Sequence, residues 1–268
     1  MDPGAAERFR ALVAAPDSTP PLDEGALLIA ATASGIDVDA WLARLDDLAG
    51  AVLAFPNAQT PAGLARVLFV DWAFAGNTIN YQDPRNSFLP DVVDRRLGLP
   101  ITLSVLMIEL GRRIGVHLHG VGMPGHFLVG VDDDPAQFVD PFHAGVVLDV
   151  SGCGERFAAL YGSQAAFDPR FLVPTSTRLI LLRMLTNLQL TYAARRSPDA
   201  RWAANLRLAF PELTREERQH TAEVLASVGA FGDATAVVDG LIVETMGGPD
   251  GARDALIRRA NAYRSRSN

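Results

Sequence analysis

The segment that decides the fold runs from Gly98 to Leu148 and reads GLPITLSVLMIELGRRIGVHLHGVGMPGHFLVGVDDDPAQFVDPFHAGVVL. Gly98 interrupts the preceding chain, and Pro100 is placed to open a helix, because proline is favoured at the first helical position. The apolar residues of this helix recur at helical spacing and form a stripe that should face a core. They are Leu103, Leu106, Met107, Leu110 and Ile114.

After this helix the apolar residues recur at a period of about two, which predicts short strands. These cover residues 117–123, 127–131, 137–139 and 146–148, separated by the turn sequences PG at 124–125, DDDP at 132–135 and PFHAG at 141–145. A further helix is expected over residues 155–161. We therefore expect an antiparallel meander packed on the preceding helix, the core of an α+β fold.

The flanking sequence is helical on both sides of this core. Trp41, Leu42, Leu45, Leu48 and Val52 fall at helical spacing, and Thr60 followed by Pro61 is an N-cap and first-position proline for a helix over residues 61–74. Helical periodicity returns after Pro174 and continues through the tail. The expected organisation is an N-terminal helical part (1–75), the α+β core (76–174) and a C-terminal helical tail (175–268).

Composition excludes several classes of function. The chain has 268 residues and a net charge of −7, which disfavours binding to nucleic acid or to an anionic membrane. All 24 basic residues are arginine, so Schiff-base, P-loop and Ser-Lys chemistry is excluded, and this usage points to a GC-rich bacterial genome. A single cysteine, no secretion signal and no long apolar run favour a soluble cytoplasmic protein without a cofactor.

The core segment also carries residues suited to acid–base chemistry. A helix N-terminus lowers a thiol pKa and binds an oxyanion, His126 can accept a proton, and Asp140 can fix the tautomer of that histidine. A plainer interpretation makes His126 a hydrogen-bonded residue of a half-buried strand and Asp140 the cap of the turn before Pro141.

The region from Asn77 to Gly145 resembles the bacterial SirB family of transglutaminase-like proteins. The similarity lies in NSFL at 86–89, RLGLPITLS at 96–104, PGHFLV at 124–129 and DPF at 140–142, with weaker similarity in 37–49 and 178–196. The resemblance implies a papain/transglutaminase-like core and a tetratricopeptide-like tail. It also implies that His126 stands at the general-base position and Asp140 at the orienting position.

The same resemblance places the nucleophile at Pro100 or Ile101, counting back from Gly115, and neither residue can act as one. Thr102 and Ser104 offer hydroxyl groups in the first turns of that helix, with capping and packing as their plainer roles. Cys153 follows the aspartate, so its position in the chain order differs from that of the superfamily. Cysteine-protease or transamidase activity is therefore not expected.

Two further groups of side chains bear on function. The loop before the helix is rich in turn-forming residues, and we expect it to line the mouth of a cleft together with the helix start; the cleft-lining set is Asn77, Tyr81, Asn86, Pro100, Thr102 and Ser104. The histidines 117, 119, 126 and 143 with Asp140 lack HExxH or CxxC spacing, so no metal site is predicted.

These observations favour a non-catalytic binding or regulatory protein, a pseudoenzyme that holds a peptide or protein partner in its cleft and tail. Two alternatives stay open. One is a hydrolase or acyltransferase in which His126 activates a hydroxyl, Cys153 or a water. The other is a scaffold that binds partners through residues 176–268 alone.

Overall fold

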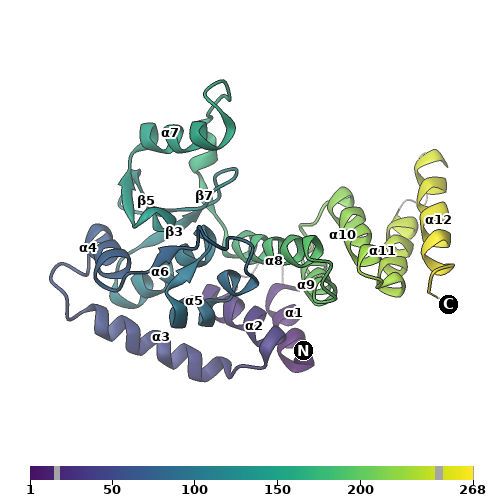
Figure 1. Cartoon of the computed structure of the whole chain (residues 1–268), viewed down its shortest axis with the longest axis horizontal. Coiled ribbons are helices and arrows are strands. Elements are labelled where there is room, and N and C mark those ends of the chain that lie inside the picture. The colour runs from purple at the N-terminus through teal and green to yellow at the C-terminus, as the bar shows by residue number, and fades with distance from the viewer. Residues whose placement is uncertain (15–18, 245–249, 268) are drawn as a thin grey trace. The chain divides into compact units, whose positions relative to one another are not determined.

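A computed structural model describes residues 1–14, 19–244 and 250–267, and it shows a mostly helical α+β protein with one small antiparallel sheet (Figure 1). The predicted fold class is confirmed. Apart from a few residues near the N-terminus, one compact unit ends at Met184 and a second begins at Leu185. None of the described helices combines the length and the apolar composition that crossing a bilayer requires.

The first unit starts with helices whose ends follow local capping chemistry. Helix α1 covers Pro3–Ala14, α2 covers Leu22–Ser34 and α3 covers Val38–Val52. Gly35 ends α2 in the left-handed conformation at φ 66°, and the Asp37 carboxylate then accepts the amides of Asp39 and Ala40 to start α3. Helices α2 and α3 both pack against α6.

Helix α6, Pro100–Ile114, is the centre of this unit, and nearly all of its residues are buried. Pro100 occupies its first turn, and Gly115 ends it at φ 79°. The helices α4 (Pro61–Arg66) and α5 (Leu89–Arg95) lie beside it. The short parallel strands β1 (Ala75–Gly76) and β2 (Leu97–Gly98) fix the chain immediately before the start of α6.

The sheet has the strand order β6-β5-β4-β3-β7, and every pairing in it is antiparallel. Its strands are β3 (Leu118–Val121), β4 (Leu128–Val131), β5 (Asp134–Asp140), β6 (Val146–Leu148) and β7 (Pro174–Thr175). Val129 pairs with Val139, so the start of β4 and the end of β5 lie at the same end of the sheet. This register brings the segments that carry His126 and Asp140 together.

Three local predictions differ from the structure. Strand β5 begins at Asp134, inside the predicted DDDP turn, because pairing with β4 extends the hairpin and leaves only two residues in the turn. Helix α7 covers Val150–Tyr161 and starts five residues earlier than expected, since the Asp149 carboxylate caps it through the Gly152 amide. Helix α4 passes into a π-helical turn, Val67–Asp71, in place of one continuous helix.

The second unit is helical. Helix α8, Thr177–Ala194, begins in the first unit and ends in the second. It is followed by α9 (Ala200–Arg207), α10 (Arg215–Ser227), α11 (Phe231–Glu244) and α12 (Asp250–Arg264). Thr214 and Glu217 form a reciprocal capping box at the start of α10. Buried aliphatic side chains from α9 to α12 make a core of their own, which includes Leu225, Val238, Leu241 and Leu256.

Candidate functional site

His126 is held by a tight turn that its own sequence specifies. The His126 amide donates to the Met123 carbonyl at 3.1 Å, and Gly125 between them has φ 71°. Proline followed by glycine at the two central positions is the preference of a type II turn, which needs a positive φ at the second of them. The turn delivers the imidazole at the start of β4, where the sheet ends.

Asp140 ends β5 and caps the following 3-10 turn, η3 (Pro141–His143). Its Oδ1 accepts the amides of Phe142 and His143 at 3.2 and 3.3 Å. The same oxygen lies 2.9 Å from Nε2 of His126. Capping and pairing with the histidine are therefore both performed by this one carboxylate.

The second oxygen of Asp140 has two further partners. Oδ2 lies 2.8 Å from Nδ1 of His143 and 3.2 Å from Nε of Arg156 on α7. Asp140 is 0% exposed, and burial alone would raise the pKa of its carboxyl group. The hydrogen bond and charge of His126, followed by those of His143, outweigh burial and hold that pKa below its ordinary value, so the group is ionised at neutral pH.

This geometry fixes the proton positions on both rings. An ionised carboxylate only accepts hydrogen bonds, so Nε2 of His126 carries a proton and Nδ1 keeps its lone pair when the ring is neutral. Among the described residues, Nδ1 of His126 has no hydrogen-bond partner. The His126 side chain is 5% exposed, whereas that of His143 is 41% exposed. The ring nitrogens that do not pair with Asp140 are therefore Nδ1 of His126 and Nε2 of His143.

Sequence reasoning did not assign His143 and Arg156 to this site. His143 follows Asp140 by three residues, so the cap that Asp140 makes on its amide is a local signal that could have suggested the contact. Arg156 approaches from α7, and nothing in the local sequence indicates that it reaches Asp140. Arg156 places a positive charge beside the buried carboxylate, and His143 adds a hydrogen bond to it.

The start of α6 supplies no nucleophile in the expected place. Pro100 and Ile101 are buried and end in carbon. The Ser104 hydroxyl is occupied, because it donates to the Pro100 carbonyl at 2.8 Å. The Thr102 hydroxyl is fully buried and has no partner among the described residues.

Cys153 is unsuited to the role that the alternative hypothesis allowed it. Its side chain is buried in an apolar cluster with Val121, Met123 and Phe157. Burial, followed by the negative charges of Asp140 and Asp149, raises the pKa of the thiol to about 12. A thiol with this pKa supplies almost no thiolate at neutral pH, so the structure argues against Cys153 as the nucleophile.

The expected cleft-lining set is largely enclosed. Asn77 donates to Oδ1 of Asn86 at 3.0 Å, and Nδ2 of Asn86 donates to the carbonyls of Asn80 and Tyr81. These amides hold the loop together from inside. Asn86, Thr102 and Ser104 are fully buried in the structure. Tyr81 is the member of the set that stands at the surface, with 46% exposure.

His126, Asp140 and His143 are the residues whose geometry comes nearest to a metal site, with their ligand atoms within 4.8 Å of one another. Their surroundings fit a hydrogen-bonded carboxylate better. The Asp140 oxygens already accept five hydrogen bonds or ion pairs, and one of these partners is the Arg156 guanidinium, whose charge opposes a cation. His119 belongs to a separate surface pair with Asp132, 2.6 Å away.

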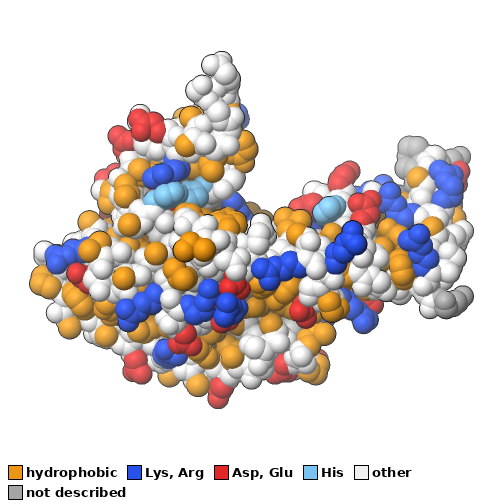
Figure 2. All heavy atoms as spheres, viewed as in Figure 1, with side chains coloured by type: hydrophobic (Ala, Val, Ile, Leu, Met, Phe, Trp, Pro, Cys, Tyr) orange, Lys and Arg blue, Asp and Glu red, His pale blue; other side chains and the backbone are white. Residues whose placement is uncertain are grey.

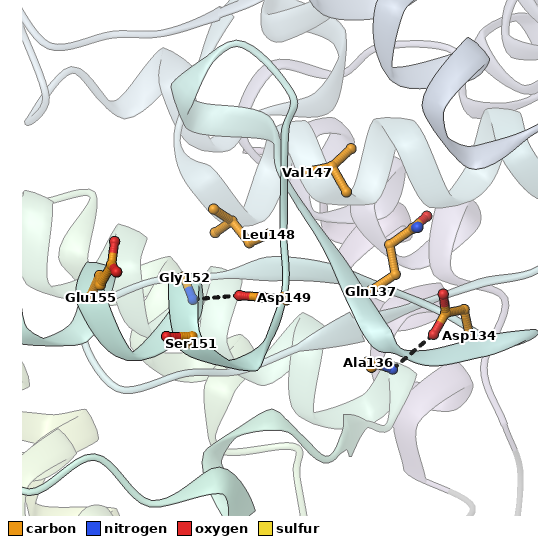
Figure 3. Close-up of a pocket in the computed structure, with 9 residues that line it drawn as sticks. All are labelled: Asp134, Ala136, Gln137, Val147, Leu148, Asp149, Ser151, Gly152 and Glu155. Carbon is orange, nitrogen blue, oxygen red and sulfur yellow. Dashed lines mark hydrogen bonds between the residues drawn. The ribbon is translucent and has the colours of Figure 1, made fainter.

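A cavity of about 620 Å³ lies between β5, β6 and the start of α7 (Figure 3). It is lined by the acidic residues Asp134, Asp149 and Glu155, with Gln137, Ser151 and neighbouring apolar side chains. The Asp149 carboxylate already accepts a hydrogen bond from the Gly152 amide at the N-terminus of α7. None of its lining residues belongs to the His126–Asp140 pair, so this cavity is distinct from the site described above.

These features define a papain- or transglutaminase-like α+β protein. They are a buried helix start, a histidine and a carboxylate that follow it on neighbouring strands, and a hydrogen bond between Nε2 of the histidine and that carboxylate. In this chain His126 and Asp140 are paired, and the start of α6 at Pro100 and Ile101 carries no nucleophilic side chain.

Comparison with known proteins agrees with this class. The profile of the "Transglutaminase-like superfamily" matches residues 39–186, and the chain belongs to that superfamily. It is 38% identical over 198 residues to a "UPF0162 protein" of Xylella fastidiosa strain 9a5c, which covers 69% of each chain. A second, from strain Temecula1, is 44% identical over 136 residues, 49% of this chain and 48% of the relative, so the match spans about half of that relative's length.

A more distant similarity extends to animals. Human "F-box only protein 21" is 34% identical over 110 residues, which are 36% of this chain and 18% of the human protein. No solved structure matches the chain significantly.

Proposed function

We propose that this chain is a non-catalytic member of the superfamily that binds a peptide or protein at the face around His126. The observation that carries the proposal is the combination of an assembled His126–Asp140 pair with a helix start that ends in carbon at Pro100 and Ile101. Covalent catalysis by this fold needs an activated nucleophile next to the base. The pair is retained here as a structural and recognition element.

Exposed aromatic side chains on both sides of the histidine support binding. The Tyr81 ring packs edge-on against Phe142, with 5.9 Å between centroids, and Phe142 packs edge-on against His126 at 6.2 Å. On the other side, Tyr161 is 52% exposed, and its hydroxyl lies beside Gly125 of the turn that holds His126. Exposed tyrosines are enriched in recognition surfaces, because the ring is apolar and the hydroxyl can bond.

The space-filling view agrees with this description. Histidine side chains, shown in pale blue, reach the surface below α7 and are bordered by hydrophobic side chains (Figure 2). A peptide with apolar residues could cover these tyrosines. The SirB-type resemblance extends the proposal to a cytoplasmic regulatory protein. We interpret the helices of the second unit as a tetratricopeptide-like tail that also holds the partner.

The experiment is a binding screen on an array of acetylated, amidated hexapeptides, with mass analysis of every bound peptide. We expect a subset to bind the wild-type protein without change in mass, and Tyr81→Ala and Tyr161→Ala to weaken that binding. Leu53→Ala, which truncates another exposed apolar side chain of the first unit, is the matched control. Cleavage or crosslinking of peptides that His126→Ala abolishes, while His119→Ala does not, would contradict a non-catalytic role.

A second function, hydrolysis or acyl transfer, is favoured by one observation. Nδ1 of His126 and the hydroxyl of Thr102 both have no hydrogen-bond partner among the described residues, so a base and a hydroxyl are both available. Turnover of an ester such as p-nitrophenyl acetate, lost in both Thr102→Val and His126→Ala, would establish this alternative. Equal rates in the wild type and both variants would remove it.

A further inference from the structure

Arg183 on α8 is a half-buried cation next to the candidate site, and it is not paired with an acid. Its Nη2 donates to the carbonyl of His126 at 2.8 Å and to that of Met123 at 3.3 Å. Its guanidinium stands over the ring of Phe127, 5.3 Å from the centroid. Among the described residues, no carboxylate lies within ion-pair distance of it, and its Nη1 and Nε make no hydrogen bond.

This environment is unlike that of two other partly buried arginines in the first unit. Arg113 shares the carboxylates of Asp23 and Glu109, and Arg156 pairs with Asp140. Burial lowers the pKa of Arg183, and among the described residues the groups that act against that effect are Tyr81 and Tyr161. A guanidinium remains charged in proteins, and buried charges are ordinarily paired, so this one has an open requirement for an anion.

The free donors of Arg183 lie where a ligand at the site could reach them. The Arg183 side chain is only half-buried. Gly122 lies close beside it: a Cβ added there would stand 3.2 Å from Nη1 and 3.0 Å from Oγ1 of Thr175, so glycine at this position leaves room for the guanidinium. Tyr81 and Tyr161, the two exposed tyrosines, are close enough to Arg183 to influence its pKa. The planar fork of a guanidinium suits a carboxylate, which it can bond through two parallel hydrogen bonds.

We propose that Arg183 binds a carboxylate of the peptide that occupies the His126 face. This inference rests on the proposed peptide-binding function and adds the chemistry that the ligand must carry. The carboxylate comes either from an acidic side chain within the peptide or from its free C-terminus. The flanking residues of the peptide are apolar, to match the two tyrosines.

The carboxylate site is tested first without any peptide. The probe is propionate, titrated into wild-type protein while the Nε–Hε resonance of Arg183 is followed by NMR, with propionamide as the uncharged control. We expect a saturable shift with propionate, none with propionamide, and no shift at the exposed Arg170, which is already paired with Asp168. Equal responses to the two probes, or no saturable response, overturn the inference whatever the peptide arrays show.

The second experiment separates a contact with the ligand from a role in holding the turn. The probes are Ac-Leu-Phe-Glu-Leu-amide, Ac-Leu-Phe-Gln-Leu-amide and Ac-Leu-Phe-Leu with a free C-terminus, measured against wild type, Arg183→Gln, Arg183→Lys and the control Arg170→Gln. We expect wild type to prefer one free-carboxylate peptide over the Gln peptide by about tenfold to 100-fold, the range for a hydrogen bond to a charged group. In Arg183→Gln that preference disappears, and Arg183→Lys restores part of it.

The outcomes are distinguishable. Preference for the Glu peptide identifies a side-chain carboxylate, and preference for the free acid identifies the C-terminus. If Arg183→Gln weakens all peptides equally and the preference persists, Arg183 only positions the turn and the inference fails. If propionate binds at Arg183 and no peptide does, the proposed peptide-binding function fails while the carboxylate site stands.

Discussion

Asp140→Asn is the substitution that probes the centre of this structure most directly. Oδ1 of the new side chain can keep the hydrogen bonds from His126 and from the amides of Phe142 and His143. The atom that replaces Oδ2 becomes an NH2 group, and it then faces Nδ1 of His143 and Nε of Arg156, which are both donors. The new NH2 group then stands donor against donor with Nε of Arg156, and His143 must move its ring proton to Nε2 to accept from it. The change also removes the negative charge among three basic groups.

The expected magnitude follows from the burial of each partner. Removing one member of a buried ion pair costs about 3 to 5 kcal/mol. His143 and Arg156 are 41% and 28% exposed, so solvent screens part of their loss, and we expect about 3 kcal/mol. Asp132→Asn is the matched control, because Asp132 pairs with His119 at the surface, and it should cost less than about 1 kcal/mol.

The assay is hydrogen exchange of the β4 and β5 amides, which reports the opening free energy of the first unit separately from the helical second unit. Because the folded-state pKa of Asp140 is depressed, its stabilisation is present above the unfolded value of about 3.9 and is lost as the pH falls through the folded value. The difference between wild type and Asp140→Asn should therefore be full at pH 7 and shrink below pH 4. A difference at pH 7 no larger than that of Asp132→Asn would refute the reasoning.

Three further perturbations test other parts of the structure. Cys153 is buried, and its thiol has a pKa of about 12, so it should resist iodoacetamide in the native protein at pH 8 and react in 6 M urea. Rapid alkylation of the native protein, detected by mass spectrometry, would contradict its burial. Gly125→Ala places a Cβ 2.8 Å from the Tyr161 hydroxyl at φ 71°, so it should lower the stability of the first unit by about 2 kcal/mol. The control Gly35→Ala, whose Cβ would meet no atom within 4 Å, should cost about 1 kcal/mol. Equal losses in denaturant unfolding would argue against the Tyr161 contact. Arg207→Met removes the hydrogen-bond donors that contact Thr186, Thr221 and Glu217. Hydrogen exchange of the α10 amides should then show that the opening free energy falls by about 2 kcal/mol. Unchanged exchange would show that this buried arginine does not stabilise the second unit.

The features that local sequence determines are those whose physical cause lies within a few residues. Pro100 opens α6, Thr60 caps α4 through the Gly63 amide, and the alternating apolar residues after Gly115 form β3 and β4. The Pro124–Gly125 pair sets the turn that holds His126. For the same reason the order of helix start, histidine and aspartate can be recognised in the amino-acid sequence by itself.

Tertiary packing decided the rest. Thr102 and Asn86 were expected at the mouth of a cleft because they lie at the helix start and in the loop before it, and in the structure neighbouring elements enclose both segments. Strand β7 has only two residues and forms because it pairs with the edge of β3, so no periodicity in the sequence could predict it.

The composition of the site shows the same division. His126 and Asp140 were predicted from their order in the chain and from the family resemblance, and the register of β4 and β5 brings them together. Arg156 and Arg183 belong to α7 and α8, and they reach the site only when those helices pack against the sheet. The sequence therefore determined which carboxylate orients which histidine, and only the tertiary structure decided which cations surround that pair, since the chain carries no local signal for contacts between residues far apart along it.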